Sequence, residues 1–411
     1  MIVSPIRLPH PRIALYSHDT MGLGHIRRNQ LIAMALAAPP LNATVLLITG
    51  VREGGAFPMP QGIDSVVLPA YRKDADGGYS SRSLNIGIDQ LTRFRADLID
   101  LALKRFQPDL FIADNVPGGA LDELLPALER MRRDGNTHCV LGLRDILDDP
   151  ETIRREWERR RNFSTLSRLY DAIWVYGDPS VYPTADIYDF PEELKAITSY
   201  TGYLDPFRSS ASRLPAQSGD VDARKTVLCS VGGGQDGFAL ACHFAAAPLP
   251  AHMRGLIVTG PLMPGENREA LLRMIAPRGD MELVEGVCDL VPLLGRADRV
   301  VAMAGYNTAN EILASGLPAL FVPRSTPRTE QLIRARRLEE LALATCLPDA
   351  QASSDAIGRW LALPTARPNA RASIDFGGLD AIVAWAGEIT SGRVCEHTAL
   401  PPLQLASVGL A

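Results

Sequence analysis

The chain has 411 residues, a length that favours two or three domains over one. Hydrophobic residues make up 46% of it and charged residues 22%, so the chain can form full hydrophobic cores, and disordered, collagen-like and coiled-coil classes are excluded. Lysine and arginine together number 42 and aspartate and glutamate 47, and the resulting net charge of −5 argues against a nucleic-acid partner.

Export and membrane-spanning signals are not visible in the sequence. No apolar run approaches the roughly 18 residues that cross a bilayer, and the first residues are broken by prolines where a signal peptide would be apolar. The cysteines are widely spaced with no C-x-x-C pair, which argues against a disulfide framework and a zinc site. We therefore expect a cytoplasmic protein with reduced thiols.

Short apolar strands alternate with amphipathic helices along the first half of the chain. Strands are expected over residues 12–17, 44–49, 64–68, 109–113, 139–143 and 172–176, and helices over 26–38, 90–106, 121–133 and 150–170. Strands joined through helices are typical of a parallel, doubly wound sheet. We assign residues 1–205 to this first domain.

A polar stretch rich in proline, serine and glycine predicts a linker over residues 206–223, after which the alternation restarts. Strands are expected over 225–230, 254–259, 282–285, 299–302 and 319–322, and helices over 238–246, 288–296, 307–315 and 329–341. We therefore expect an α/β protein of two doubly wound, Rossmann-like domains that face each other across a cleft. The C-terminal domain is expected to cover 224–391, and residues 392–411 form a tail.

The C-terminal domain opens with a glycine-rich turn that joins its first strand to its first helix. Gly232, Gly233 and Gly234, followed by Gln235 and Gly237, let backbone N–H groups approach an anion, and the next helix adds partial positive charge. The turn has neither the dinucleotide G-x-G-x-x-G pattern nor the Lys-Ser/Thr of a P-loop. On its own this motif fits a phosphate site or a plain tight turn about equally well.

The first domain has a different turn, Gly22-Leu23-Gly24-His25, at the start of its first helix. Because a helix N-terminus disfavours the imidazolium form, we expect His25 to be neutral near pH 7 and able to accept a proton as a general base. The alternative is a histidine that only caps the helix. Asp19 lies in the same loop, where it could orient the imidazole or cap the turn.

A third motif begins at Gly305 and continues through Asn307, Thr308 and Glu311. It predicts a helix whose start points at the cleft, with Thr308 and Glu311 one turn apart on the same side. A carboxylate in this position can bind two ribose hydroxyls while Thr308 and backbone amides meet phosphate. The alternative for Glu311 is an exposed carboxylate that balances arginines.

These motifs resemble those of the nucleotide-sugar-dependent glycosyltransferases of the GT-B fold. The likeness is greatest to the branch, with a family 28 type C-terminal domain, that adds N-acetylglucosamine to the lipid-linked peptidoglycan precursor. The matching positions are Gly24 and His25 in the first loop, Gly233, Gly234 and Gln235 in the second turn, Gly305, Thr308 and Glu311 in the helix motif, and Gln331. The likeness is strong over roughly residues 225 to 345 and thin over 30 to 220.

The resemblance implies roles for these residues. Glu311 would hold the nucleotide ribose, the turn at 232–237 and Thr308 the diphosphate, and Gln331 the hydroxyls of the donor sugar; uracil is the implied base. The first loop departs from the family, because it has less glycine and also looks like the loop of a nucleotide-sugar hydrolase of pseudaminic acid synthesis. The acceptor is therefore left open.

We expect an inverting transfer with His25 as the base and no cofactor, the nucleotide sugar being the substrate. Because no D-x-D signature stands at a strand end, backbone amides and helix dipoles are expected to stabilise the leaving diphosphate without a metal. Two alternatives remain: a hydrolase or epimerase of the same fold, and a binding regulator without chemistry.

The acceptor side is expected in the first domain, where Asp114 and Arg144 stand at predicted strand ends. Ordinary loop capping is the competing interpretation for such strand-end groups. Arg72, Lys73 and Arg82 flank a glycine pair and could meet an anionic acceptor or the inner face of the membrane, although a solvated loop is the simpler interpretation.

Overall fold

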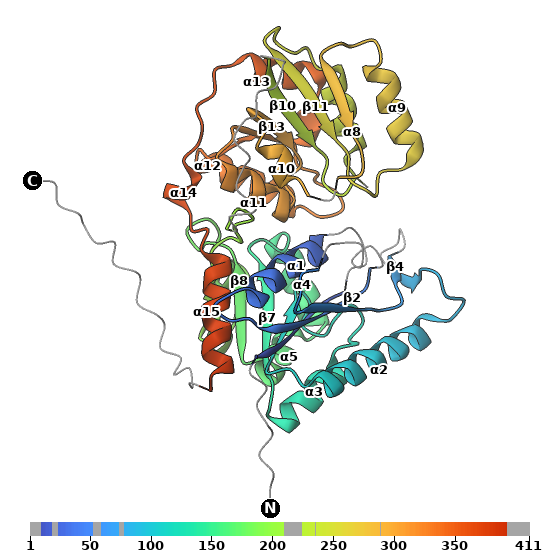
Figure 1. Cartoon of the computed structure of the whole chain (residues 1–411), viewed down its shortest axis with the longest axis vertical. Helices are drawn as coiled ribbons and strands as arrows, with labels where there is room; N and C mark the ends of the chain where they lie inside the picture. The colour runs from blue at the N-terminus through green and yellow to red at the C-terminus, as the bar shows by residue number, and fades with distance from the viewer. Residues whose placement is uncertain are drawn as a thin grey trace, which may run out of the picture.

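The computed structural model describes residues 10–18, 24–51, 59–73, 78–208, 224–234, 236–287 and 289–392. Two of the predicted site residues, Asp19 and Gln235, lie outside these ranges. The described chain forms two α/β domains stacked along the long axis of the molecule (Figure 1).

The first domain is built on a seven-stranded parallel sheet in the order β3-β2-β1-β6-β7-β8-β9. Its strands are β1 (Arg12–Ser17), β2 (Thr44–Thr49), β3 (Ile63–Val67), β6 (Leu110–Asp114), β7 (His138–Arg144), β8 (Ala172–Tyr176) and β9 (Thr198–Tyr200). The chain order reverses between β1 and β6, and such a switch point opens a crevice at the carboxyl ends of the strands.

Helices cover both faces of this sheet, as a doubly wound domain requires. They are α1 (Gly24–Ala37), α2 (Ile88–Phe106), α3 (Leu125–Asp134), α4 (Pro150–Arg159), α5 (Asn162–Leu169), α6 (Thr184–Ile187) and α7 (Glu192–Lys195), with a small hairpin of β4 (Tyr71–Lys73) and β5 (Tyr79–Ser81) at the edge. The single helix expected over 150–170 is two helices, because Arg161 adopts a left-handed conformation with φ 53°.

The second domain has a six-stranded parallel sheet in the order β12-β11-β10-β13-β14-β15. Its strands are β10 (Lys225–Ser230), β11 (Met253–Val258), β12 (Met281–Val284), β13 (Arg299–Ala302), β14 (Ala319–Phe321) and β15 (Thr345–Cys346). The helices are α8 (Phe238–Ala246), α9 (Gly265–Ile275), α10 (Val291–Leu294), α11 (Tyr306–Ser315), α12 (Glu330–Glu340), α13 (Ser354–Ala362) and α14 (Ala370–Ser373), with a 3₁₀ turn at Asp349–Gln351.

The last helix, α15 (Gly378–Thr390), crosses back to the first domain and lies beside it in Figure 1. It packs on α1, and its Trp385 ring lies 5.5 Å from the ring of Trp174 in β8. Residues 378–390 thus pack as part of the first domain, whereas the sequence analysis assigns them to the end of the C-terminal domain. The apolar face of α15, with Ile382 fully buried, explains the crossing, because α1 offers it a partner.

Candidate active site

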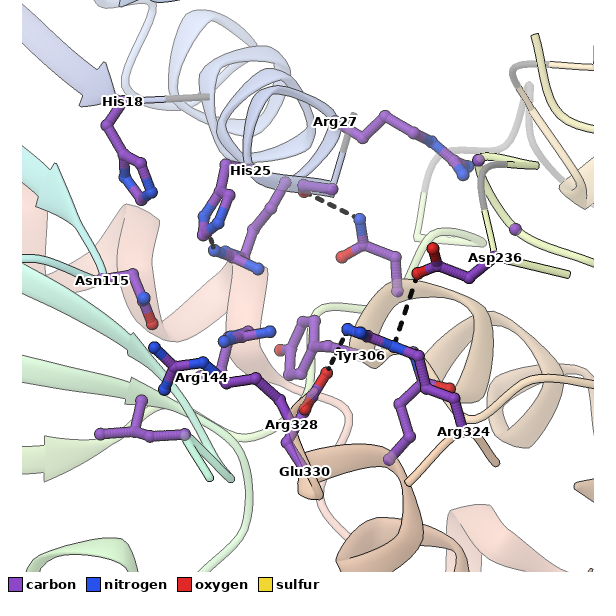
Figure 2. A pocket seen from close by; sticks show the side chains of 18 of the residues that line it. His18, His25, Arg27, Asn115, Arg144, Asp236, Tyr306, Arg324, Arg328 and Glu330 are labelled. Atoms are coloured by element: carbon purple, nitrogen blue, oxygen red, sulfur yellow. Dashed lines mark hydrogen bonds and ion pairs between the residues drawn. The ribbon is translucent and has the colours of Figure 1, made fainter. Parts of the chain in front are cut away.

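A cavity of about 420 Å³ lies between the domains, where the carboxyl ends of the strands of both sheets meet. The first domain contributes the start of α1 and the residues that follow β6 and β7. The second contributes the turn after β10 and the starts of α11 and α12. Figure 2 shows these side chains converging from the two domains.

His25 is the second residue of α1, lines the cavity and retains 17% of its side-chain exposure. Its Nδ1 lies 2.5 Å from Oδ2 of Asp114, which ends β6 and is fully buried. A carboxylate can only accept, so Nδ1 carries the hydrogen and donates it to Asp114. This tautomer leaves Nε2 with a free lone pair, as a general base requires.

Arg28, one helical turn after His25, also binds Asp114. Its Nε donates to Oδ1 at 3.1 Å and its Nη2 donates to both carboxylate oxygens at 2.6 and 2.7 Å, and both side chains are buried. Burial alone would raise the pKa of Asp114, but the charges of Arg28 and His25 and their hydrogen bonds lower this pKa well below its usual range. Asp114 is therefore an anion at every ordinary pH and holds the His25 ring in place.

His18 follows β1 and packs against His25, with the two ring centroids 4.7 Å apart. Burial, followed by the influence of His25, lowers the pKa of His18 well below its ordinary value. Its Nδ1 is buried and has no hydrogen-bond partner. A neutral His18 adds no positive charge beside His25.

The glycine-rich turn after β10 forms the opposite wall, where Gly232, Gly233 and Gly234 line the cavity. Gly234 has φ +92°, and a Cβ there would lie 2.9 Å from the backbone nitrogen of Met263. Glycine is therefore required at this position for both conformation and space. The turn brings bare backbone to the cavity, as an anion site needs.

Helix α11 begins at Tyr306 with Gly305 as its N-cap and no side-chain capping bond, so its first N–H groups face the cavity together with Asn307 and Thr308. The Asn307 side chain donates to the backbone oxygen of Gly24 at 2.9 Å, which ties the two domains at the mouth of the site.

Glu311 lies apart from the other residues that the sequence predicts to bind the donor. It does not line this cavity but a neighbouring groove of about 290 Å³. Its Oε1 accepts from Arg27 of α1 at 2.6 Å, whereas Oε2 is buried without a partner. Burial raises the pKa of Glu311, against the effect of Arg27.

Gln331, near the start of α12, lines the cavity and has its side-chain oxygen buried without a partner. Beside it Glu330 accepts from Arg324 at 3.1 Å, and Arg324 also lies 3.6 Å from Asp236 of the glycine-rich loop. The start of α12 thus brings the Gln331 side-chain amide, whose oxygen has no partner, next to Arg324, which is paired with Glu330.

Two features of the site were not anticipated from the sequence. The carboxylate that orients His25 is Asp114, which the sequence analysis had placed with the acceptor; Asp19, proposed for that task, lies outside the described residues. Arg28 belongs to the loop pattern shared with the nucleotide-sugar hydrolase but has no role predicted from the sequence, although its position three residues after His25 puts both side chains on one face of α1. Arg144, predicted for the acceptor side, lines the cavity from the end of β7.

The two facing doubly wound domains define the GT-B fold, and the fold class predicted from the sequence is confirmed by solved structures that share it. One is the calicheamicin glycosyltransferase CalG4, with a TM-score of 0.59 and 16% identity, covering 94% of this chain and all of the other. A second is MurG of Acinetobacter baumannii, with a TM-score of 0.53 and 14% identity, covering 92% of this chain and 94% of the other.

In sequence the chain is similar to UDP-N-acetylglucosamine–N-acetylmuramyl-(pentapeptide) pyrophosphoryl-undecaprenol N-acetylglucosamine transferases, which confirms the resemblance drawn from the motifs. The enzyme of Sorangium cellulosum is 29% identical over 224 residues, which are 51% of this chain and 55% of the relative. That of Sodalis glossinidius is 29% identical over 163 residues, 38% of this chain and 46% of the relative. The chain thus spans about half the length of these relatives, and no family model matches it.

Two further observations concern only the part of the chain that the structure describes. None of its helices is both long and apolar enough to span a bilayer. Within the same ranges, no group of three or more histidine, cysteine, aspartate or glutamate side chains is arranged to hold a metal ion.

Proposed function

We propose that this protein is a glycosyltransferase that moves a sugar from a uridine diphosphate donor to an acceptor hydroxyl, with inversion and without a metal. The observation that carries the proposal is the His25–Asp114 pair, which faces the bare backbone of residues 232–234 across the cavity of a GT-B fold. A base and an anion site on opposite walls are what an in-line displacement at a sugar carbon needs.

In the proposed reaction Nε2 of His25 takes the proton of the acceptor hydroxyl as its oxygen attacks the anomeric carbon. The bond between that carbon and the diphosphate oxygen breaks, and its electron pair leaves with the nucleoside diphosphate. Asp114 stays ionised and stabilises the imidazolium that forms. Attack on the face opposite the leaving group inverts the sugar carbon.

The negative charge that develops on the diphosphate would be stabilised by the glycine-rich turn, by Thr308 and by the first N–H groups of α11. Arg324 and Gln331 lie on the same side of the cavity, with Gln331 positioned to bind hydroxyls of the donor sugar. These groups provide stabilisation in place, and for this reason the proposed transfer needs no metal.

Several observations support a uridine nucleotide as the donor. The matched sequence relatives are named for UDP-N-acetylglucosamine, and the similar structure of Phytolacca americana UGT2, with a TM-score of 0.56, holds UDP-2-fluoroglucose. Glu311, which lines the neighbouring groove, would hold the ribose in the resemblance, a contact that any nucleotide could make. The acceptor is defined only as a hydroxyl that reaches Nε2 of His25.

A panel of nucleotide sugars tests the proposal by thermal unfolding. A donor that binds only the folded state stabilises it by about 2.7 kcal/mol when present at a hundred times its Kd. We expect UDP-sugars to raise the Tm and GDP-sugars to leave it unchanged. If neither UDP nor any UDP-sugar binds, the proposed function is refuted.

With a donor that binds, the release of UDP then distinguishes transfer, hydrolysis and binding without reaction. UDP release that requires an added hydroxyl acceptor supports transfer. Release of UDP and free sugar in water alone would mean hydrolysis instead, and tight binding without release under any acceptor would mean a regulator. His25→Ala should lower the release rate by about 10²- to 10⁴-fold, the usual cost of losing a general base.

A further inference from the structure

Arg144 is the one cavity-lining arginine for which the described residues provide no ion pair or hydrogen bond. The other cavity arginines each lie within 4.0 Å of a carboxylate. These pairs are Arg27–Glu311, Arg28–Asp114, Arg160–Glu156, Arg324–Glu330 and Arg328–Asp148. The guanidinium of Arg144 therefore brings a positive charge to the cavity that no carboxylate pairs with directly, although Glu330 and Asp114 lie near enough to offset it in part.

The Arg144 side chain is half-buried. Its Nε is buried and has no hydrogen-bond partner. Burial, and then the nearby charge of Arg28, lower the pKa of Arg144 to about 10. A half-buried cation whose Nε has no partner costs folding free energy, and such a cost is typical of a group kept for a ligand.

The position of Arg144 separates it from the donor's diphosphate. It ends β7 in the first domain, whereas the glycine-rich turn and the start of α11 belong to the second. On the first domain's side of the cavity Asn115 lies after β6, with its side-chain oxygen also buried and unpartnered (Figure 2). Both groups come from the wall that carries His25.

We propose that Arg144 binds a second anionic group of the substrates, a carboxylate or a phosphate distinct from the donor's diphosphate, and so positions the reacting partners at His25. This inference rests on the proposed function, which supplies the diphosphate at the other wall. The planar guanidinium suits either anion, because it presents parallel N–H donors.

The test titrates inorganic phosphate by calorimetry into protein saturated with UDP-N-acetylglucosamine, so that the diphosphate site is already filled. We expect binding to the wild type in the millimolar range and a loss of at least about tenfold in Arg144→Gln. Arg144→Lys should retain part of the affinity. Arg132→Gln, which removes the same charge from an exposed arginine outside the cavity, should bind phosphate like the wild type.

The source of the anion is assigned by exchanging the donor for UDP-glucuronate. If the donor sugar supplies the carboxylate, UDP-glucuronate will block phosphate binding and will itself bind Arg144→Gln more weakly. If the acceptor supplies the anion, phosphate will bind in the presence of either donor. Each of these outcomes supports the anion site.

The Tm of Arg144→Gln distinguishes an anion-binding role of Arg144 from a structural role. Because Arg144→Gln removes a charge that has no direct ion pair, its Tm should equal or exceed that of the wild type. The proposal is overturned if the donor-saturated wild type does not bind phosphate, if Arg144→Gln binds phosphate equally well, or if lost binding comes with a lower Tm. If UDP-N-acetylglucosamine does not bind the wild type, UDP or another UDP-sugar that binds takes its place in the titration. If none of them binds, the proposed function fails, and the same titration on free protein still tests Arg144.

Discussion

Asp114→Asn tests two proposed effects of the buried carboxylate, which are to stabilise the fold by pairing with Arg28 and to orient His25 for turnover. The substitution keeps the shape of the side chain but removes the charge that pairs with Arg28 and accepts from His25. Arg28 is only 3% exposed, so it would be left as a buried, unpaired cation. Breaking such a pair from one side costs about 3–5 kcal/mol of unfolding free energy.

The effect on turnover is separate from the effect on stability. The side-chain amide introduced by Asp114→Asn could donate to Nδ1 of His25 and so favour the tautomer that carries the hydrogen on Nε2, where it cannot act as a base. We expect the rate of UDP release to fall by about 10²- to 10⁴-fold. Donor affinity should change little, because the donor's diphosphate is proposed to bind the second domain.

Urea unfolding and single-turnover UDP release measure the two effects on the same preparation. Asp100→Asn is the matched control: Asp100 also pairs with an arginine at 2.6 Å but keeps 34% of its side-chain exposure, so its loss should cost no more than about 1 kcal/mol. Adding Arg28→Met to the Asp114→Asn variant should recover part of the stability and none of the rate.

The pH dependence of the unfolding free energy provides a second test of Asp114. Since the folded-state pKa of Asp114 is depressed, its stabilisation is fully present above the unfolded value of about 3.9 and is lost as the pH falls below it. The stability gap between wild type and Asp114→Asn should therefore narrow below about pH 4. If Asp114→Asn keeps its turnover within about tenfold of wild type while His25→Ala does not, Asp114 does not orient the base and its proposed role is refuted.

Three further predictions concern the rest of the site and the fold. Gly234→Ala should weaken UDP-sugar binding in calorimetry and lower the Tm, because φ +92° and the close Met263 nitrogen exclude a Cβ; Gly265→Ala, where a Cβ would meet only the end of a flexible arginine, should do neither. Arg27→Ala should leave Glu311 buried without its cation, and since burial raises the pKa of that carboxyl, the variant's stability in urea should fall relative to wild type as the pH rises above about 4.3; a constant difference across pH would contradict this. Ile382→Ala should cost about 2–5 kcal/mol if α15 is an integral part of the first domain, whereas Ala384→Ser on its exposed side should cost almost nothing.

Most of the two sheets could be predicted because their central strands are short apolar runs bounded by turn residues. The strand 12–17 and the strand 225–230 coincide with β1 and β10. The break at Arg161 could not be predicted, since nothing in that basic helix marks a residue with positive φ. The crossing of α15 depends on which apolar surface is left uncovered, and that is a property of the assembled domains.

The pairing of His25 with Asp114 illustrates how the candidate site is assembled. The two residues are 89 positions apart, and only the parallel pairing of β1 with β6 brings the end of one strand beside the end of the other. The doubly wound pattern already implied that these strands adjoin at the switch point. The position of Glu311 beside Arg27 could not be inferred in this way, because it depends on how the domains close on each other.

The return of α15 has a consequence for how the molecule opens. Because β1 and α15 belong to the same lobe, the other lobe is attached by two passages of backbone, which run next to each other where Leu204 bridges to Gly377. Any swing that admits substrate must bend both passages together, so the adjacent pair acts as a single pivot. Severing only one of them would leave the halves joined through the other.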